Sequence, residues 1–335
     1  MRRALIALGI GLSVLASTTV TAPARAASVV KVRLAYTMAD AQEVARFWLA
    51  DGAANLRNAT PYDVWTGLAG ERLATDVVPG GPPYSVPPVE GTVQPVGDAP
   101  TTLGKVFFIG SDLAPHWCTG TSVQTAYRNL VATAGHCMLD VEAPMGALGK
   151  WVFVPGYSGG AVPHGLYVGK EAIGHYDFDD LRDRDRDYGF VAVHDGAVLS
   201  AAGVLTSVGR LGDNVGCQGM TFNQPLAPEA DLFGYPGGES LERVAGSPFA
   251  MLLAGPREDR PVGVGSSFAG AGWLGSSWLT RYAGDSRTGY LNGITMGVSD
   301  TDGDGRNDAS VSAYFDGEAA EVYRYAAHRW SGPIA

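Results

Sequence analysis

Short β-favouring runs, separated by clusters of Gly, Pro and Asp, constrain the fold more than any other feature of this 335-residue chain. The runs lie at residues 105–109, 151–154, 187–193, 230–234 and 290–298. Runs of this length with turn-forming residues between them are typical of an all-β sandwich or barrel. We find no internal repeat of fixed period, so a propeller or solenoid is not expected.

Two stretches favour helix instead. Between residues 38 and 60, Val44, Phe47 and Trp48 fall at helical spacing among polar residues, which predicts a surface helix. Near the C-terminus, Asp316 can cap a second helix, with Glu318 and Arg324 pointing outward. The side chains expected along one face of that helix are Ala319, Val322, Tyr323, Ala326 and Trp330.

Composition divides the chain into three parts. Residues 1–26 have a basic start, an apolar run and a small-x-small end, which predicts a cleaved secretory signal. Residues 27–100 form an N-terminal pro-segment or arm that ends in a linker, because residues 79–100 hold seven of the 20 prolines. The main domain is expected at residues 101–335.

Charge and hydropathy narrow the choice of partners. Beyond residue 26, 21 basic residues face 34 acidic ones, a formal charge of −13, so a nucleic-acid partner is not expected. No later stretch approaches the roughly 18 apolar residues of a membrane span, so we expect an exported protein without a membrane partner. A hydrophobic content of 46% supports a folded core.

Three cysteines allow at most one internal disulfide. Cys118 and Cys137 are close in sequence, whereas Cys217 stands alone. A bridge between the first two would close a loop for which the chain-entropy model gives about 3 kcal/mol. Thiolate binding of a metal is the weaker interpretation, because the neighbouring His116 and His136 do not complete a standard zinc spacing.

The most informative motif is Thr133-Ala134-Gly135-His136-Cys137, preceded by Cys118-Thr119-Gly120-Thr121. It resembles the histidine box of the trypsin/chymotrypsin-like serine peptidases. The resemblance implies that His136 is the general base and that Cys118 and Cys137 are bridged. It also implies a chymotrypsin-like fold of two antiparallel six-stranded β-barrels followed by a C-terminal helix.

A general base of this kind needs a buried carboxylate that fixes its tautomer. Asp187 is the best candidate, because it leads directly into an apolar strand, as the catalytic Asp of the family does. Asp185 is the competing acid but lacks the strand immediately after it. The alternating charges of residues 182–186 predict a solvated loop.

The nucleophile is where the resemblance fails. The family pattern is Gly-x-Ser-Gly-Gly-Pro, often followed in bacterial members by Trp and Leu. Counting back from Trp273 and Leu274 places Ala269 at the nucleophile position. Ser267 and Ser266 lie two and three residues earlier, and they could serve only if the loop shifted its register.

Other stretches resemble the bacterial glutamyl-endopeptidase-like branch of the family, so the resemblance covers about residues 103–330. These stretches are 152–157, 233–236 and 290–293. Two further departures accompany the missing serine: residues 249–265 lack the second cysteine pair of many relatives, and Met296 stands where the family has a Ser that positions its Asp.

A separate acidic motif runs from residue 300 to residue 308. Alternate carboxylates with a Gly between them can converge on one calcium ion. The candidate ligands are Asp300, Asp302, Asp304 and Asp308, although Val311 stands where an EF-hand has its bidentate Glu. The competing interpretation is an acidic hairpin tip between Val298 and Val311.

These observations leave three functions open. The preferred one is a secreted, monomeric serine-peptidase homologue that does not cleave, needs no catalytic cofactor and binds a peptide or protein in the cleft between its barrels. The second is an active serine endopeptidase that uses Ser267. The third is a calcium-stabilised extracellular binding module.

Overall fold

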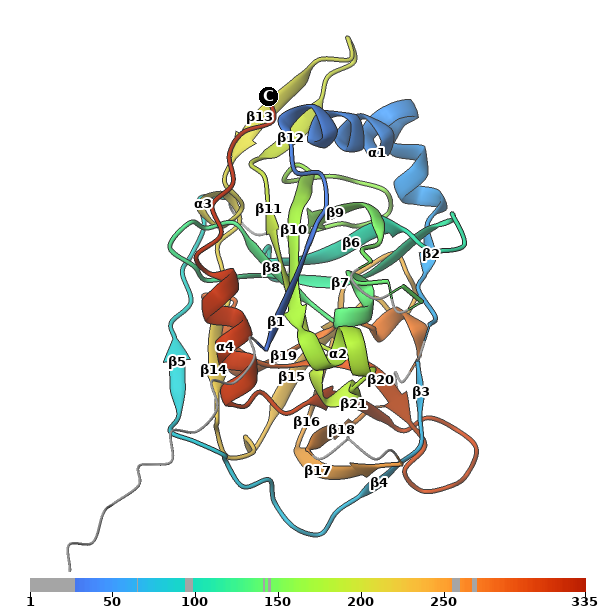
Figure 1. Ribbon diagram of the computed structural model, residues 1–335, viewed down its shortest axis with the longest axis vertical. Coiled ribbons are helices and arrows are strands. Elements are labelled where there is room, and N and C mark those ends of the chain that lie inside the picture. Colours follow the sequence, from blue (N-terminus) through green and yellow to red (C-terminus); the bar gives the residue numbers. More distant parts are fainter. Residues whose placement is uncertain are drawn as a thin grey trace, which may run out of the picture.

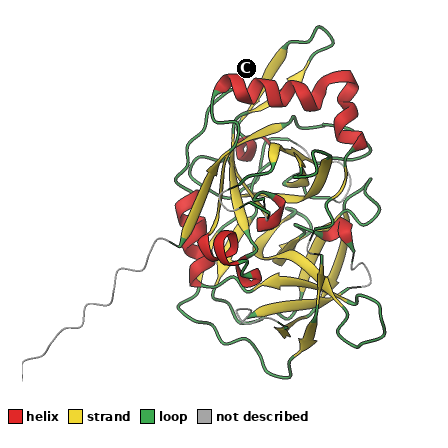
Figure 2. Cartoon of the chain, turned by 45° about the vertical axis from the view of Figure 1, so that its right-hand side comes forward, coloured by secondary structure: helices red, strands yellow, loops and turns green. Residues whose placement is uncertain are grey.

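The computed structural model describes residues 28–64, 66–93, 99–140, 142–143, 146–254, 260–266 and 270–335. The predicted signal sequence at residues 1–26 lies outside this part of the chain. Strands fill two stacked bodies, and one long helix lies across the end of the first (Figure 2).

Six strands close into the first barrel, in the order β10-β11-β8-β7-β6-β9, because β9 pairs with β10 as well as with β6. All of these neighbours are antiparallel. The strands are β6 (Leu103–Ile109), β7 (Pro115–Val123), β8 (Leu130–Thr133), β9 (Gly149–Pro155), β10 (Tyr167–His175) and β11 (Gly189–Val193).

Alternation along the strands explains how both faces of this barrel are buried. Val106 belongs to the cluster that also contains Val131 and Phe153, whereas its neighbour Phe107 packs against Trp48 of helix α1 (Met38–Asn58). The helix predicted after residue 38 is thus confirmed, and Thr37 caps it. Ahead of it, β1 (Val29–Arg33) pairs with β10 at the edge of the same sheet.

The second sheet is a half-barrel that follows the order β16-β15-β19-β20-β21-β18-β17. The strand β20 (Thr288–Ser299) also pairs with β14 (Gly219–Phe222). The other strands are β15 (Ala230–Gly234), β16 (Glu242–Gly246), β17 (Pro248–Leu253), β18 (Pro261–Gly265), β19 (Ser277–Ala283) and β21 (Ala309–Ala313). A small separate sheet contains β12 (Gly196–Leu199) and β13 (Leu205–Gly209).

After α1 the chain runs along one side of both bodies, past β2, β3 and β4, and returns on the other side at β5 (Figure 1). We call the described part of this stretch, residues 60–64 and 66–73, the crossing segment. It contains β2 (Thr60–Pro61), β3 (Gly67–Leu68) and β4 (Gly70–Arg72). The strand β5 (Tyr84–Val86) lies within residues 79–100, the predicted linker, and it pairs with β14.

The C-terminal helix α4 (Gly317–Ala326) begins as predicted, with the Asp316 carboxylate accepting the backbone N–H groups of Glu318 and Ala319. Two expectations about its faces are wrong. The Glu318 side chain does not point into solvent but lies half-buried against Arg186. Trp330 lies beyond the end of the helix and is 63% exposed, because the chain leaves the helical path after residue 326.

All five predicted strand regions form strands, and the expected all-β, two-barrel architecture with a C-terminal helix is confirmed, the second barrel being a half-barrel. Among the described residues, no helix is both long enough and apolar enough to cross a membrane.

Candidate active site

The pairing of β8 with β11 brings the two predicted site residues together. These strands are antiparallel, with Thr133 opposite Gly189, so the end of β8 and the start of β11 lie at the same edge of the barrel. His136 follows β8 in the turn η1 (Gly135–Cys137), and Asp187 precedes β11. Two residues separated by 51 positions in the sequence therefore meet at one point.

The Asp187 carboxylate holds His136 by two hydrogen bonds. Its Oδ2 accepts from Nδ1 of the imidazole at 2.7 Å, and its Oδ1 accepts from the backbone N–H of His136 at 2.9 Å. A carboxylate only accepts, so the ring proton is placed on Nδ1. Both residues are buried, at 0% and 2% exposed. Together the two bonds fix the tautomer and the orientation of the ring.

In the neutral imidazole with its proton on Nδ1, the opposite ring nitrogen, Nε2, carries a lone pair. It is buried and has no hydrogen-bond partner among the residues that the structure describes. Buried polar atoms normally have hydrogen-bond partners, so an unpaired buried acceptor is a candidate site for contact with a ligand. This arrangement can accept a proton from a hydroxyl or an amine brought to Nε2.

Close packing beneath the histidine depends on Gly135. A Cβ at this position would lie 2.8 Å from the Phe178 ring and 3.0 Å from Oδ1 of Asp187, too close for either neighbour. Next to the histidine, Cys137 is bridged to Cys118 of β7, the predicted disulfide. The bridge ties the His136 turn to a barrel strand and excludes these sulfurs as thiolate metal ligands. Cys217 is free and buried.

The predicted nucleophile position, Ala269, and the alternative Ser267 both lie outside the described residues. Their flanks are described. On one side Ser266 is buried, and its N–H donates to the carbonyl of Asp308 at 2.8 Å. On the other side the carbonyl of Leu274 accepts from the N–H of Thr119 at 2.8 Å. Thr119 follows Cys118, so this flank is anchored beside the disulfide.

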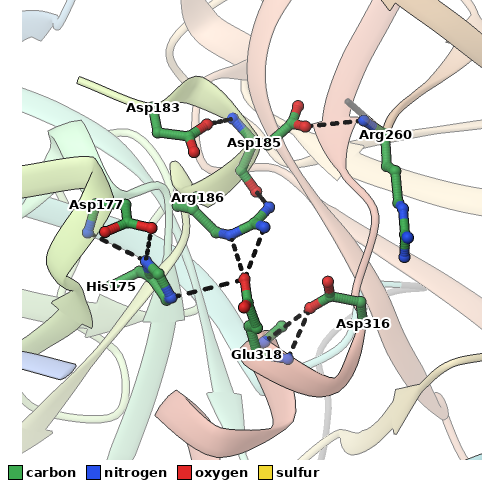
Figure 3. Close-up of polar contacts among 9 residues, drawn as sticks. His175, Asp177, Asp183, Asp185, Arg186, Arg260, Asp316 and Glu318 are labelled. Atoms are coloured by element: carbon green, nitrogen blue, oxygen red, sulfur yellow. Dashed lines mark hydrogen bonds and ion pairs between the residues drawn. The ribbon is translucent and has the colours of Figure 1, made fainter. Parts of the chain in front are cut away.

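Residues 182–186, expected to form a solvated loop, are partly buried. Asp185 is 1% exposed, and its Oδ2 accepts the N–H of Arg260, just ahead of β18, at 2.8 Å. Arg186 donates from Nε and Nη2 to Oε2 of Glu318 at 2.8 and 2.6 Å (Figure 3). The prediction is wrong because acceptors and donors from the distant β18 and α4 satisfy these charges, which local sequence cannot show.

Tyr62, in the crossing segment, is a site neighbour that the sequence did not indicate. Its ring stacks on the His136 imidazole, with centroids 6.2 Å apart and planes at 23°, and it meets Phe108 edge-on. It is 4% exposed. Burial, and then the nearby Asp140 carboxylate, raise the pKa of Tyr62 to about 12, so the phenol stays neutral.

The acidic hairpin at residues 300–308 joins β20 to β21, as the hairpin interpretation expects. Carboxylate oxygens of Asp300, Asp302 and Asp304 lie within 4.8 Å of one another. Asp308 does not join them, because its carboxylate accepts from the backbone N–H and the hydroxyl of Thr301. The converging three are the residues that could hold a calcium ion.

Comparison with known proteins agrees with this fold. No family model matches the chain, and a search of curated proteins finds no match. Among solved structures, the chain is similar to the protease Anisep from Arthrobacter nicotinovorans, with 24% identity and a TM-score of 0.58 over 69% of this chain and 98% of that one.

Two further structures are similar. The thermostable serine protease AL20 from an extremophilic microorganism has 22% identity and a TM-score of 0.55, over 68% of this chain and 97% of that one. A Glu endopeptidase has 17% identity and a TM-score of 0.50, over 76% and 100%. At these identities the likeness establishes the double-barrel fold of the chymotrypsin-like serine proteases.

Proposed function

We propose that this protein is a secreted homologue of the serine peptidases that binds an extended peptide between its barrels without hydrolysing it. The observation that carries the proposal is the His136–Asp187 pair, held by two hydrogen bonds, whose Nε2 is buried without a partner among the described residues. A binding site between the barrels is also supported by sheet edges that accept added strands there.

The proposal that the protein does not hydrolyse peptides is supported by the sequence of the nucleophile loop. Serine-type acyl transfer needs a hydroxyl whose proton passes to the base, and the register set by Trp273 and Leu274 puts the methyl group of Ala269 at that position. Trp273 and Leu274 are both buried, which supports their use as a register mark. Without an attacking oxygen, no covalent bond to a peptide carbonyl can form, even though the base and its carboxylate are present.

The alternative is an active endopeptidase that uses Ser267. It shares the 2.7 Å contact between His136 and Asp187, a geometry that suits a working general base, so the pair by itself fits both candidates. The two candidates differ in one chemical property, the formation of a covalent adduct at serine.

Reaction with a fluorophosphonate probe, followed by peptide mass mapping, separates them. We expect no adduct in the unmodified protein and labelling at residue 269 in Ala269→Ser. Losing the nucleophile of a related triad costs on the order of a millionfold in turnover, so the contrast is large. A wild-type adduct that Ser267→Ala abolishes, and that the exposed-site control Ser240→Ala leaves intact, would show an active peptidase.

Two further properties belong to the proposal. Secretion is supported by the signal-like residues 1–26 and by the disulfide, since disulfides persist in oxidising compartments. A calcium ion at Asp300, Asp302 and Asp304 would serve to stabilise the fold and would take no part in chemistry.

A further inference from the structure

We propose that the crossing segment is an intramolecular ligand: it fills the peptide-binding edges of both barrels and covers His136. The inference rests on the proposed function, because it concerns the occupancy of the same site. It implies that a separate peptide can displace the crossing segment and bind in its place.

Main-chain hydrogen bonds hold the segment to both bodies. On the first barrel, the N–H of Tyr62 donates to the carbonyl of Trp117 at 2.9 Å. On the second, the N–H of Val298 donates to the carbonyl of Thr66 at 2.8 Å, and the N–H of Leu73 donates to Ala250 at 2.9 Å. Such bonds do not depend on side-chain identity, which is how an added strand binds a sheet edge.

Strand direction sets β2 apart from the strands of the first barrel. All neighbours within the first barrel are antiparallel, whereas β2 runs parallel to β7 and β3 runs parallel to β20. The first barrel therefore does not use the orientation of β2 in its own closure. In the second body, β14 also runs parallel to β20, and β4 of the segment pairs antiparallel with β17. Removal of the segment would leave the β7 and β20 edges with unpaired backbone groups, ready for another strand.

Two side chains anchor the segment, and most of the others are exposed. Tyr62 is 4% exposed on the first barrel, and Leu68 is 8% exposed on the second. The anchors lie six positions apart in the sequence, Tyr62 just after β2 and Leu68 within β3. This combination of backbone bonding and two pockets is the pattern of a bound peptide more than that of a core strand.

A glycine in β20 makes room for the second anchor. A Cβ at Gly297 would lie 2.7 Å from Cδ1 of Leu68 and 2.8 Å from the carbonyl oxygen of Thr66. Its φ is ordinary, so the backbone conformation does not require glycine there. Glycine is required there because the crossing segment approaches closely, which is one of the established reasons for a glycine inside a strand.

The first anchor is also the cover of the site. The Tyr62 ring lies over the imidazole, and His136 is fully buried. A tethered ligand has an effective concentration of about millimolar, so a free peptide competes poorly until the segment is displaced. The partner that fits the freed edges is an extended peptide with an aromatic residue at the first anchor and an aliphatic one six residues later.

The first test releases the anchors and measures the reactivity of the histidine. Tyr62→Ala combined with Leu68→Asp is compared with Tyr127→Ala combined with Leu113→Asp, which alters exposed residues of the same types. Diethyl pyrocarbonate acylates imidazole nitrogens, and peptide mapping reads each histidine separately. We expect His136 to react about tenfold faster, or more, in the anchor variant and to stay unreactive in the wild type and the control.

The inference would be overturned if the anchor variant folds, as an unchanged near-UV spectrum would show, and its His136 is acylated no faster than in the wild type. Native-state hydrogen exchange of the wild type covers the case in which the variant does not fold. We expect the hydrogen-bonded amides of Tyr62 and Leu73, together with that of Val298, to exchange through a local opening ahead of Val131 in the first barrel. The inference would also be overturned if the amides of the crossing segment and of Val298 exchange only through global unfolding, together with that of Val131.

A third measurement separates this inference from the proposed function. A fluorescent synthetic peptide with the sequence of residues 58–74 is titrated into the wild type and the anchor variant, and a peptide with Ala and Asp at the two anchor positions serves as its control. We expect binding to the variant alone. If His136 becomes reactive but no peptide binds, the crossing segment is confirmed as the cover and peptide binding by the site is refuted.

Discussion

Lys105 is a lysine that the structure buries almost completely among aromatic rings. It is 2% exposed, its Nζ lies 3.4 Å from the ring centroid of Trp117, and it donates to the carbonyl of Gly238 at 2.5 Å. The ring centroids of Tyr157 and Tyr235 lie 4.9 and 5.0 Å from the same Nζ. The ammonium thus joins the first barrel to the loop after β15 in the second.

Burial lowers the pKa of Lys105 to about 7, from 10.5, because desolvation disfavours the ammonium. The unfolded chain therefore binds more protons between about pH 7 and pH 10.5, and this residue makes the free energy of unfolding rise with pH in that window. The stability it contributes is fully present above the upper value and is lost as pH falls toward 7.

We expect the stability difference between the wild type and Lys105→Met to change with pH, by at most about 1.4 kcal/mol per pH unit for one proton. Denaturant unfolding from pH 6 to pH 10 measures it, with the wild type gaining relative to the variant as pH rises. Lys31→Met, at an exposed position, is the control. A difference that stays constant across the range would show that Lys105 keeps its proton in the folded state.

At the scale of elements, the acidic hairpin between β20 and β21 is held by its own backbone. The two oxygens of the Asp300 carboxylate accept the N–H groups of Gly303 and Gly305, at 2.7 and 2.8 Å. These bonds lower the pKa of Asp300, the bond from Gly305 most, so the carboxylate keeps its charge in mild acid. Three such charges within 4.8 Å repel one another unless a cation joins them.

Calcium is expected to stabilise the protein through this hairpin. Binding to the native state alone adds about 2.7 kcal/mol at a hundredfold excess over Kd. The melting temperature measured in chelator and in millimolar calcium tests this, and Asp302→Asn should reduce the shift whereas Asp76→Asn, at an exposed position elsewhere, should not. Equal melting temperatures in the two buffers would leave an acidic hairpin without an ion.

At the scale of the whole molecule, Asp185 joins the loop of the site carboxylate to the second body. Its Oδ2 accepts the Arg260 N–H at 2.8 Å, and its own N–H donates to Asp183 at 3.1 Å. Beyond Arg260 the chain enters β18 and leads to Ser266. The same turn that presents Asp187 therefore also fixes the start of the strand that leads to the nucleophile loop.

Asp185→Ala should lower the free energy of unfolding by about 1–3 kcal/mol, because it leaves the Arg260 N–H without its charged acceptor. Asp180→Ala, at an exposed position five residues earlier, should change it by no more than about 0.5 kcal/mol. Urea unfolding of the two variants provides the comparison. Equal values for both would show that the contact between the barrels contributes nothing measurable.

Local sequence determined much of this protein. The strand runs and the two helix starts follow from short patterns, because turn residues and caps act within a few residues. The disulfide, which closes a separation of 19 residues, was expected from the cysteine spacing and from the resemblance. The family resemblance carried by the motif around His136, together with the acid before an apolar strand, predicted the pair whose side chains lie 2.7 Å apart. The pairing of β8 with β11, which places His136 and Asp187 at one edge of the barrel, came from the structure.

Only the tertiary structure decided what surrounds that pair. Tyr62 covers His136, Asp185 is buried and Glu318 turns inward, and each depends on a contact with a residue at least 70 positions away. The burial of Lys105 also depends on tertiary structure, because no local pattern indicates that a lysine within a strand will lie among rings from both barrels. Burial of a polar group depends on which distant partners the fold supplies, and no local pattern encodes them.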